Sequence, residues 1–236
     1  MAIRWPLLVR RTHKWLGLVL GVQVLMWTVS GMYMVAIHID YIHGDHLVRS
    51  QAAPPRDLAG LVDPSVIAAS EPTAREVKMQ TFLDQPVWRV DTKDGPRLYD
   101  GVTGAPVPAL TRDQAERVAK RIYTGEPTIV STQLLTTAPI EMQTRKPPYW
   151  RVEFEGWNQP TLYISPVTGE LISRRHNLWR IFDFAWMLHI MDYSERTDVN
   201  NPLLRVATWS AVFMALAGAW LLYWSFPRRK KAKKLV

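Results

Sequence analysis

The sequence predicts an α+β membrane protein in which two transmembrane helices flank one extracytoplasmic α+β domain. Three observations predict this class. Two uncharged apolar runs of membrane-spanning length lie near the two ends of the chain. Basic residues are concentrated outside these runs. The segment between the runs has a mixed, charged composition and contains a repeated pattern of strand-like motifs.

The first apolar run extends from Trp15 to Ile37 and contains no Asp, Glu, Lys, Arg or His. About 20 helical residues cross a hydrocarbon core of ~30 Å, so the run predicts a transmembrane helix over 15–37 after a cytoplasmic segment over 1–14. A cleaved signal peptide is the alternative. The run is longer than a signal sequence needs, and residues 38–41 do not form a small-x-small cleavage site. We therefore expect the helix to be retained.

The second apolar run extends from Val206 to Phe226 and is equally free of charge. It predicts a transmembrane helix over 203–226, followed by a basic cytoplasmic tail over 227–236. Both runs contain aromatic side chains, several of them near the ends, where amphipathic rings favour the level of the lipid headgroups. These side chains are Trp15, Trp27, Trp209, Trp220, Tyr223 and Trp224.

The distribution of charge predicts the orientation in the membrane. The segments 1–14 and 227–236 carry ten Lys and Arg and no acid, whereas the other 19 of the 29 bases and all 21 acids lie between them. Positive residues favour the cytoplasmic side, so both termini are predicted to be cytoplasmic. The net charge of +8 therefore comes from the tails. It indicates contact with anionic lipid and not with nucleic acid, which would need a basic face on the folded domain.

The chain contains no cysteine. This excludes disulfides, iron–sulfur clusters, thiolate nucleophiles and covalently attached c-type haem. Any haem would have to be bound by His, Met, Tyr or carboxylate side chains. The sequence has no spacing typical of a Ser-His-Asp triad, a zinc site or a phosphate loop, so it identifies no catalytic residues and we predict no metal site.

The segment between the apolar runs contains an internal repeat. Three motifs, Trp88-Arg89-Val90, Leu98-Tyr99 and Val102-Thr103-Gly104, recur in the same order as Trp150-Arg151-Val152, Leu162-Tyr163 and Val167-Thr168-Gly169. Each copy is typical of a strand, a polar turn, a return strand and a Thr-Gly turn. The repeat therefore predicts two β-hairpins.

Each predicted hairpin is preceded by a helical pattern. Residues Thr111 to Gln114 form a capping box, and apolar residues follow it at i, i+3, i+4 and i+7. These apolar residues are Ala115, Val118, Ala119 and Ile122. The segment from Asp63 to Ser70 predicts a shorter helix before the first hairpin. The order of helix, hairpin, helix, hairpin predicts an α+β domain.

The boundaries follow from these elements. The α+β domain is predicted over 63–175, with repeats at about 63–108 and 111–172. A juxtamembrane linker over 38–62, which contains Pro54 and Pro55, joins it to the first span. Residues 176–202 are predicted to form an interfacial amphipathic helix and a loop, because apolar residues recur along them next to the second span.

The motifs resemble those of the PepSY-associated transmembrane proteins, in which a His-basic-Trp-Leu-Gly sequence opens the first span and small PepSY hairpin domains follow. Here the opening is His13-Lys14-Trp15-Leu16-Gly17, with Ser30-Gly31 late in the same run. The resemblance implies a bacterial inner-membrane location with a periplasmic PepSY domain. In larger members it also implies b-type haem and reduction of ferric siderophores. This chain has two predicted spans and no Gly-rich dinucleotide loop, so electrons would come from a quinol or a partner protein.

Histidines are the candidate cofactor-binding residues, because haem b needs two axial side chains, usually His, on facing helices. The candidates are His189, His38, His43, His46 and His13. His13 and His38 are separated by about 37 Å of helix, so they cannot bind one iron. We expect His189 to meet His38, His43 or His46 on the outer side. The alternative is that His189 forms local hydrogen bonds, that the other three are solvated, and that His13 acts as a juxtamembrane cation.

Two functions are open. The leading hypothesis is an accessory or electron-transfer protein that holds b haem and serves reduction of iron or another periplasmic acceptor; an enzymatic role would make it a membrane oxidoreductase component. The alternative is a non-catalytic subunit or regulator that binds a partner by adding a strand at an exposed sheet edge. Expected partners are the lipid bilayer, a membrane or periplasmic protein and a second copy of the chain. Two pairs of small residues, Gly17-x-x-x-Gly21 and Ala215-x-x-x-Ala219, would let helices pack closely, either within the chain or between copies.

Overall fold

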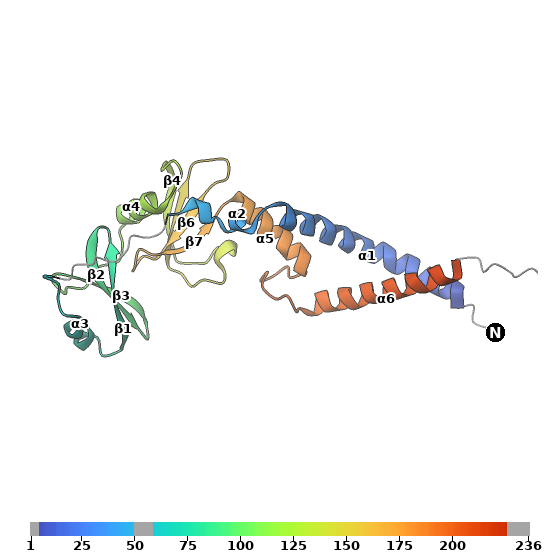
Figure 1. Cartoon of the computed structure of the whole chain (residues 1–236), viewed down its shortest axis with the longest axis horizontal. Helices are drawn as coiled ribbons and strands as arrows, with labels where there is room; N and C mark the ends of the chain where they lie inside the picture. The colour runs from blue at the N-terminus through green and yellow to red at the C-terminus, as the bar shows by residue number, and fades with distance from the viewer. Residues whose placement is uncertain (1–4, 50–58, 226–236) are drawn as a thin grey trace, which may run out of the picture. The chain divides into compact units, whose positions relative to one another are not determined.

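The computed structural model describes residues 5–49 and 59–225. The chain divides into two compact units. A helical unit contains the helices near both ends of the chain, and an α+β unit comprises residues 38–181 with two sheets (Figure 1). This confirms the predicted combination of two apolar helices and an α+β region between them.

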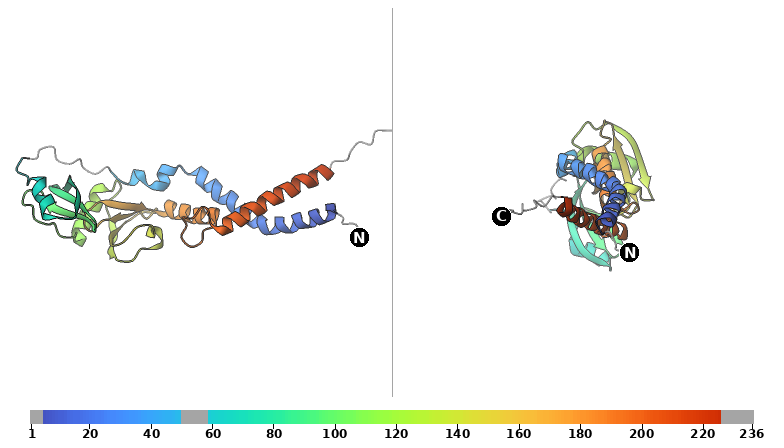
Figure 2. Two further views of the ribbon diagram at one scale, coloured as in Figure 1. Left: turned by 90° about the horizontal axis from the view of Figure 1, so that it is seen from below. Right: turned by 90° about the vertical axis from the view of Figure 1, so that its right-hand side faces the viewer.

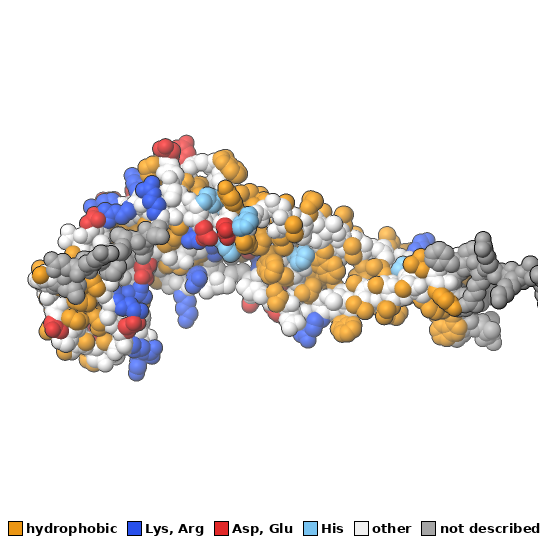
Figure 3. All heavy atoms as spheres, viewed as in Figure 1, with side chains coloured by type: hydrophobic (Ala, Val, Ile, Leu, Met, Phe, Trp, Pro, Cys, Tyr) orange, Lys and Arg blue, Asp and Glu red, His pale blue; other side chains and the backbone are white. Residues whose placement is uncertain are grey.

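The helical unit contains two helices that are long and apolar enough to cross a membrane, α1 (Trp5–Ala36) and α6 (Pro202–Ser225). Figure 3 shows hydrophobic side chains along the surface of both helices. Val19 and Trp209, for example, are each 72% exposed. A contiguous apolar surface of this kind is unfavourable in water and suits lipid. Helix α1 begins ten residues before the predicted span, so the basic residues Arg10, Arg11 and Lys14 lie within the helix.

Helices α1 and α6 pack against each other and cross in the left view of Figure 2. A Cβ added to Gly17 would lie 3.7 Å from Met214 Sδ, and one added to Gly218 would lie 3.1 Å from His13 Cε1. His13 lies one turn before Gly17 on α1, whereas Gly218 lies one turn after Met214 on α6. The two helices are therefore antiparallel. Continuing this register brings Pro202 to the level of about Val29. Helix α1 therefore extends roughly 10 Å beyond the start of α6.

Helix α5 (Asn177–Ile190) crosses the division between the units, and its end packs on α1. Gln23 Nε2 donates to Leu188 O at 3.2 Å, and Trp27 Nε1 donates to His189 O at 2.8 Å. Asn201 Nδ2 donates to Ile190 O at 2.8 Å. The last carbonyls of a helix have no partner within it, so these side chains stabilise the end of α5.

The first sheet of the α+β unit is antiparallel with the order β1-β2-β3. Its strands are β1 (Ala74–Phe82), β2 (Gln85–Thr92) and β3 (Gly95–Asp100). Helix α3 (Pro64–Ser70) precedes it, and the Asp63 side chain caps this helix by accepting from Ser65 N at 2.7 Å. Ile67 of α3 packs with Trp88, Val90 and Tyr99 on one face of the sheet.

The second sheet is antiparallel with the order β4-β5-β6-β7. Its strands are β4 (Ile129–Leu135), β5 (Tyr149–Phe154), β6 (Thr161–Ile164) and β7 (Leu171–Arg175). Helix α4 (Arg112–Ile122) precedes it and begins at the predicted capping box: Gln114 N donates to Thr111 Oγ1, and Thr111 N donates to Gln114 Oε1. All four residues of its predicted apolar stripe are buried, which confirms that stripe.

One hydrophobic core joins the two sheets. It combines the stripe of α4 with inward residues of both sheets, among them Phe82, Val87, Leu98, Val152, Phe154, Leu162 and Ile164. The Phe82 ring fits against Gly169, where a Cβ would lie only 2.6 Å from Phe82 Cε2. Gly169 also has a φ of 69°, which favours glycine. The Thr-Gly turn of the second repeat is therefore a packing element as well as a turn.

Part of the predicted linker is folded. Residues 38–49 form α2 (Ile39–His43), the short 3-10 helix η1 (Asp45–Leu47) and a bridge from Val48 to Tyr123. The side chains of Ile42 and Leu47 are buried, which explains why this segment packs on the α+β unit. A second 3-10 helix, η2 (Ile140–Met142), lies between β4 and β5. Pro54 and Pro55 lie outside the described residues.

Candidate functional site

The six histidines are divided between the two units. His13 and His189 belong to the helical unit, and the other four belong to the α+β unit. The expected meeting of His189 with His38, His43 or His46 therefore concerns side chains of different units, and it stays a prediction.

His189 makes a hydrogen bond to α1. Its Nδ1 lies 3.0 Å from Ser30 Oγ, and the Ser30 hydroxyl is also 2.7 Å from Met26 O. When that hydroxyl donates to Met26, His189 Nδ1 carries the proton and donates to Ser30, which leaves the lone pair on Nε2. Gly31 also lies against this ring, since a Cβ added there would be at an ordinary contact distance of 3.7 Å from His189 Cε1. The imidazole is thus oriented by α1, with Nε2 as the nitrogen that suits a ligand bond.

His13 lies on α1 opposite Gly218 of α6. Its Nδ1 is buried and has no hydrogen-bond partner among the described residues. Because His189 contacts Ser30, the two histidines lie about 25 Å apart along α1 at 1.5 Å per residue. They cannot share one iron, so this unit of a single chain does not by itself supply the axial pair of a bis-histidine haem.

The histidines near the start of the α+β unit have different surroundings. The exposed His38 caps α2, with Asp40 N donating to its Nδ1 at 3.3 Å. The ring of His46 lies with its centroid 4.8 Å from that of Tyr41 and 6.1 Å from that of His176. His43 lines a pocket described below.

His176 is a buried residue that the sequence reasoning did not select. It is fully buried, and its Nδ1 accepts from Trp179 N at 3.4 Å in the first turn of α5. Burial lowers its pKa to about 4, helped by the nearby charge of His46 and opposed by hydrogen bonding to the backbone of Ile42 and Tyr41. The ring is therefore neutral at pH 7. Its position just before a helical pattern was the available signal, since side chains there accept from N–H groups of the first turn.

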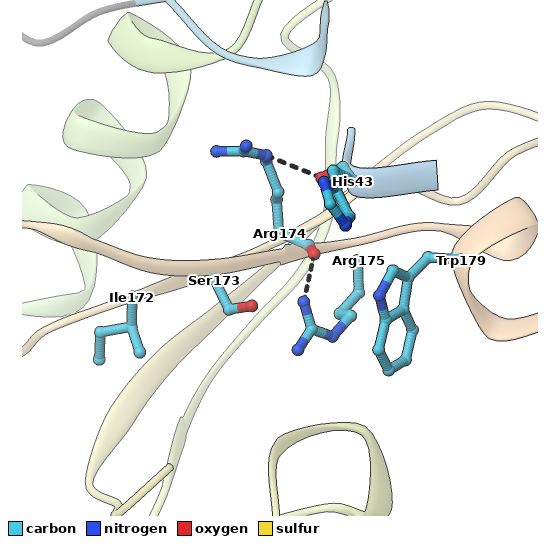
Figure 4. A pocket seen from close by; sticks show the side chains of 6 residues that line it. All are labelled: His43, Ile172, Ser173, Arg174, Arg175 and Trp179. Carbon is cyan, nitrogen blue, oxygen red and sulfur yellow. Dashed lines mark hydrogen bonds between the residues drawn. The ribbon is translucent and has the colours of Figure 1, made fainter. Parts of the chain in front are cut away.

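A pocket of about 240 Å³ lies beside β7 (Figure 4). It is lined by His43, Ile172, Ser173, Arg174, Arg175 and Trp179. The Arg175 guanidinium stacks over the Trp179 ring at 3.9 Å, and its Nη1 donates to Arg174 O at 2.8 Å. Arg174 Nε donates to His43 O at 2.8 Å, which ties β7 to the end of α2. The pocket thus brings one sequence-predicted histidine together with two arginines that the sequence reasoning did not select.

The outer strands of the two sheets differ in how their edges are protected from pairing with another strand. β1 contains Arg75, Glu76 and Lys78, and β7 contains two arginines, whereas β4 contains neither a charge nor a proline. Val130 and Leu134 of β4 are 67% and 47% exposed. Sheet edges are commonly protected by charges, prolines or very short strands. β4 has seven residues and none of these protections.

The model of the PepSY-associated TM region family matches residues 10–236. No curated protein and no solved structure matches the chain. The family match and the two apolar helices make the protein a membrane protein that contacts the lipid bilayer. The chain belongs to the PepSY-associated TM region family.

Proposed function

We propose that the protein is a membrane-anchored accessory subunit or regulator whose α+β unit binds an extended segment of a partner protein along the outer edge of β4. The observation that carries this proposal is the unprotected, uncharged edge of β4. Addition of a strand satisfies the unused backbone groups of such an edge, and the neighbouring side chains give specificity.

The hydrogen-bond pattern identifies the backbone groups that a partner would use. Glu155 N donates toward β4, to Thr128 O, whereas Phe154 N donates toward β6, to Pro160 O. N–H groups alternate in direction along a strand, so every second residue of β5 before Glu155 also points to β4. The β4 residues that pair with these positions of β5 are Ser131, Gln133 and Leu135, and their N–H groups point back to β5. The N–H groups of Thr132 and Leu134 therefore point to the outer edge.

Crosslinking tests this proposal in the native membrane. A photo-reactive residue at Val130 should give an adduct with one extended segment of a partner, and Leu134→Pro should remove it by deleting an outward N–H. Proline is tolerated there because that group makes no bond within the sheet. The matched control is a photo-reactive residue at Val102, which is 57% exposed and lies after the first sheet. An equal adduct at Val102, no adduct at Val130, persistence in Leu134→Pro, or an adduct with a second copy of this chain would overturn the proposal.

We also propose that the two sheets, each with its preceding helix, are two PepSY units related by an internal repeat. Two parallel sets of contacts support this. Trp88 Nε1 donates to Val62 O and Trp150 Nε1 donates to Leu110 O, and each acceptor directly precedes a helix N-cap residue. Asp100 Oδ1 accepts from the N–H groups of Val102 and Thr103, and Ser165 Oγ accepts from those of Val167 and Thr168.

The pairing register refines the alignment of these units. Trp88 pairs with Tyr99, whereas Trp150 pairs with Ile164 and not with Tyr163. The sequence alignment of Leu98-Tyr99 with Leu162-Tyr163 is therefore displaced by one residue. Within the proposed repeat, Tyr99 corresponds to Ile164.

Electron transfer through b haem is a second candidate function. The observation that favours it is the buried Nδ1 of His13, which lacks a partner among the described residues. Haem would supply one-electron transfer, and this chain would contribute His13 or His189 as one axial ligand. If His13 is the first axial ligand, the second would come from another copy of the chain. If His189 is the first, the second would be His38, His43 or His46. An absorption spectrum of the purified protein tests this. A Soret band that is lost in His13→Ala or His189→Ala supports it, and a colourless protein refutes it.

We further propose that the protein lies in the bacterial inner membrane with both termini in the cytoplasm and the α+β unit in the periplasm. Ten bases and no acid in the two end segments support this orientation.

A further inference from the structure

We propose that the pocket beside β7 binds a small oxyanion-bearing molecule, whose carboxylate or phosphate group is held by Arg175 and His43. This site is separate from the β4 edge, which lies at the opposite side of the second sheet. The inference therefore does not depend on the proposed partner binding.

The charge of the pocket lining favours an anion. Three of the six lining residues have basic side chains, and none is acidic. Arg174 forms an ion pair with Asp45, which lies outside the lining, and burial lowers the pKa of Arg174. An anion in the pocket therefore meets basic side chains and no carboxylate of the lining.

Arg175 is held in place before any ligand arrives. Its guanidinium stacks on Trp179 at 3.9 Å, its Nε donates to Glu141 O at 3.1 Å and its Nη1 donates to Arg174 O at 2.8 Å. Guanidinium groups match the geometry of carboxylates and phosphates, and a group that is already fixed loses little conformational freedom on binding. Figure 4 shows Arg175 and Trp179 side by side among the lining residues.

The rest of the lining indicates the size and character of the ligand. The volume of about 240 Å³ is below the ~300–1,000 Å³ of sites for drug-sized molecules, so the ligand is small. The indole of Trp179 and the side chain of Ile172 offer apolar walls, and the Ser173 hydroxyl offers one more hydrogen bond. A small organic anion with an apolar body fits this combination better than a bare ion.

The oxyanion has two conceivable sources. It belongs either to a soluble small molecule or to the phosphate of a lipid headgroup, because His43 follows the end of α1 by only seven residues. Both sources offer the same chemistry to Arg175 and His43. The experiment separates them by the form in which the oxyanion is presented.

The test measures thermal unfolding of the full chain in detergent. The probes are sodium phosphate and sodium benzoate against sodium chloride at equal ionic strength, and phosphatidylglycerol against phosphatidylcholine in mixed micelles. At about ten times the dissociation constant we expect a rise of roughly 4 °C in the unfolding midpoint over the matched reference. A response to soluble anions indicates a soluble ligand, and a response to phosphatidylglycerol alone indicates a headgroup.

Variants decide whether the pocket causes the response. His43→Ala and Arg175→Gln should each abolish the rise, whereas Arg145→Gln removes the same charge at an exposed position outside the pocket and should retain it. If Arg175→Gln lowers the unfolding midpoint in the absence of ligand, the result with His43→Ala decides the test. The side chain of His43 is exposed, so its removal is not expected to destabilise the fold. No rise with any probe, or an undiminished rise in His43→Ala, would overturn the proposal.

Discussion

Acidification should destabilise the α+β unit through His176. The residue is fully buried, and burial lowers its pKa to about 4, compared with ~6.5 in the unfolded chain. Above pH ~6.5 the ring is neutral in both states, so it contributes no pH dependence. As pH falls from ~6.5 to about 4, the unfolded chain binds a proton that the folded chain does not, so the free energy of unfolding decreases. The difference between the two pKa values corresponds to a loss of roughly 3 kcal/mol by pH 4.

The matched variant for this prediction is His176→Asn. Its side-chain oxygen can accept from Trp179 N as an N-cap, but it does not titrate. Urea unfolding of both proteins in detergent at pH 7.0, about 5.5 and about 4.5 gives the free energy of unfolding. Carboxylates with lowered pKa values, such as Glu71 and Glu141, occur in both proteins and cancel in the comparison. A wild-type protein that loses no more stability than the variant would refute the assignment of a buried neutral His176.

Three further predictions concern topology, packing and the cofactor. A reporter active only outside the cytoplasm should work when fused near Thr111, and one active only in the cytoplasm should work at Val236; the reverse pattern would contradict the proposed orientation. Gly169→Ala should lower the free energy of unfolding by about 1–3 kcal/mol, because both its φ of 69° and the Phe82 ring oppose a Cβ. Gly60→Ala has a similar φ of 79° and open space, so it measures the backbone cost alone, and an equal loss in both variants would exclude the packing effect. If haem is bound through His189, His189→Ala should remove or shift the Soret band without impairing membrane insertion, and an unchanged band would exclude His189 as a ligand.

Local patterns predicted those parts of the fold that depend on neighbouring residues. The capping box at Thr111 and Gln114 and the apolar stripe behind it lead directly to α4, because both act within one or two helical turns. The uncharged runs likewise lead to α1 and α6, since length and composition alone determine whether a helix suits lipid. The α+β class followed because helical and strand periodicities alternate along the chain.

Contacts between distant residues could not be predicted in the same way. The pocket joins His43 to four consecutive residues of β7 and to Trp179, more than 120 positions away in the sequence. No local pattern marks such a meeting. His176 was missed for a related reason: its burial comes from packing against Gly44, where a Cβ would lie 3.1 Å from His176 Cδ2. Selecting histidines by their distance in sequence from the spans favoured exposed residues such as His38 over the one that the fold buries.

Polar residues within the first apolar helix acquire a structural role from the same distant contacts. Gln23 and Ser30 are buried in an otherwise lipid-compatible helix, and buried polar groups are costly unless they are hydrogen-bonded. Gln23 donates to the end of α5, and Ser30 bonds to the carbonyl of Met26 and to His189. Together with Trp27, they fix the imidazole of His189 and the last carbonyls of α5 against α1. These contacts therefore give the buried polar groups of α1 hydrogen-bond partners and fix the last turn of α5 (Asn177–Ile190) within the helical unit.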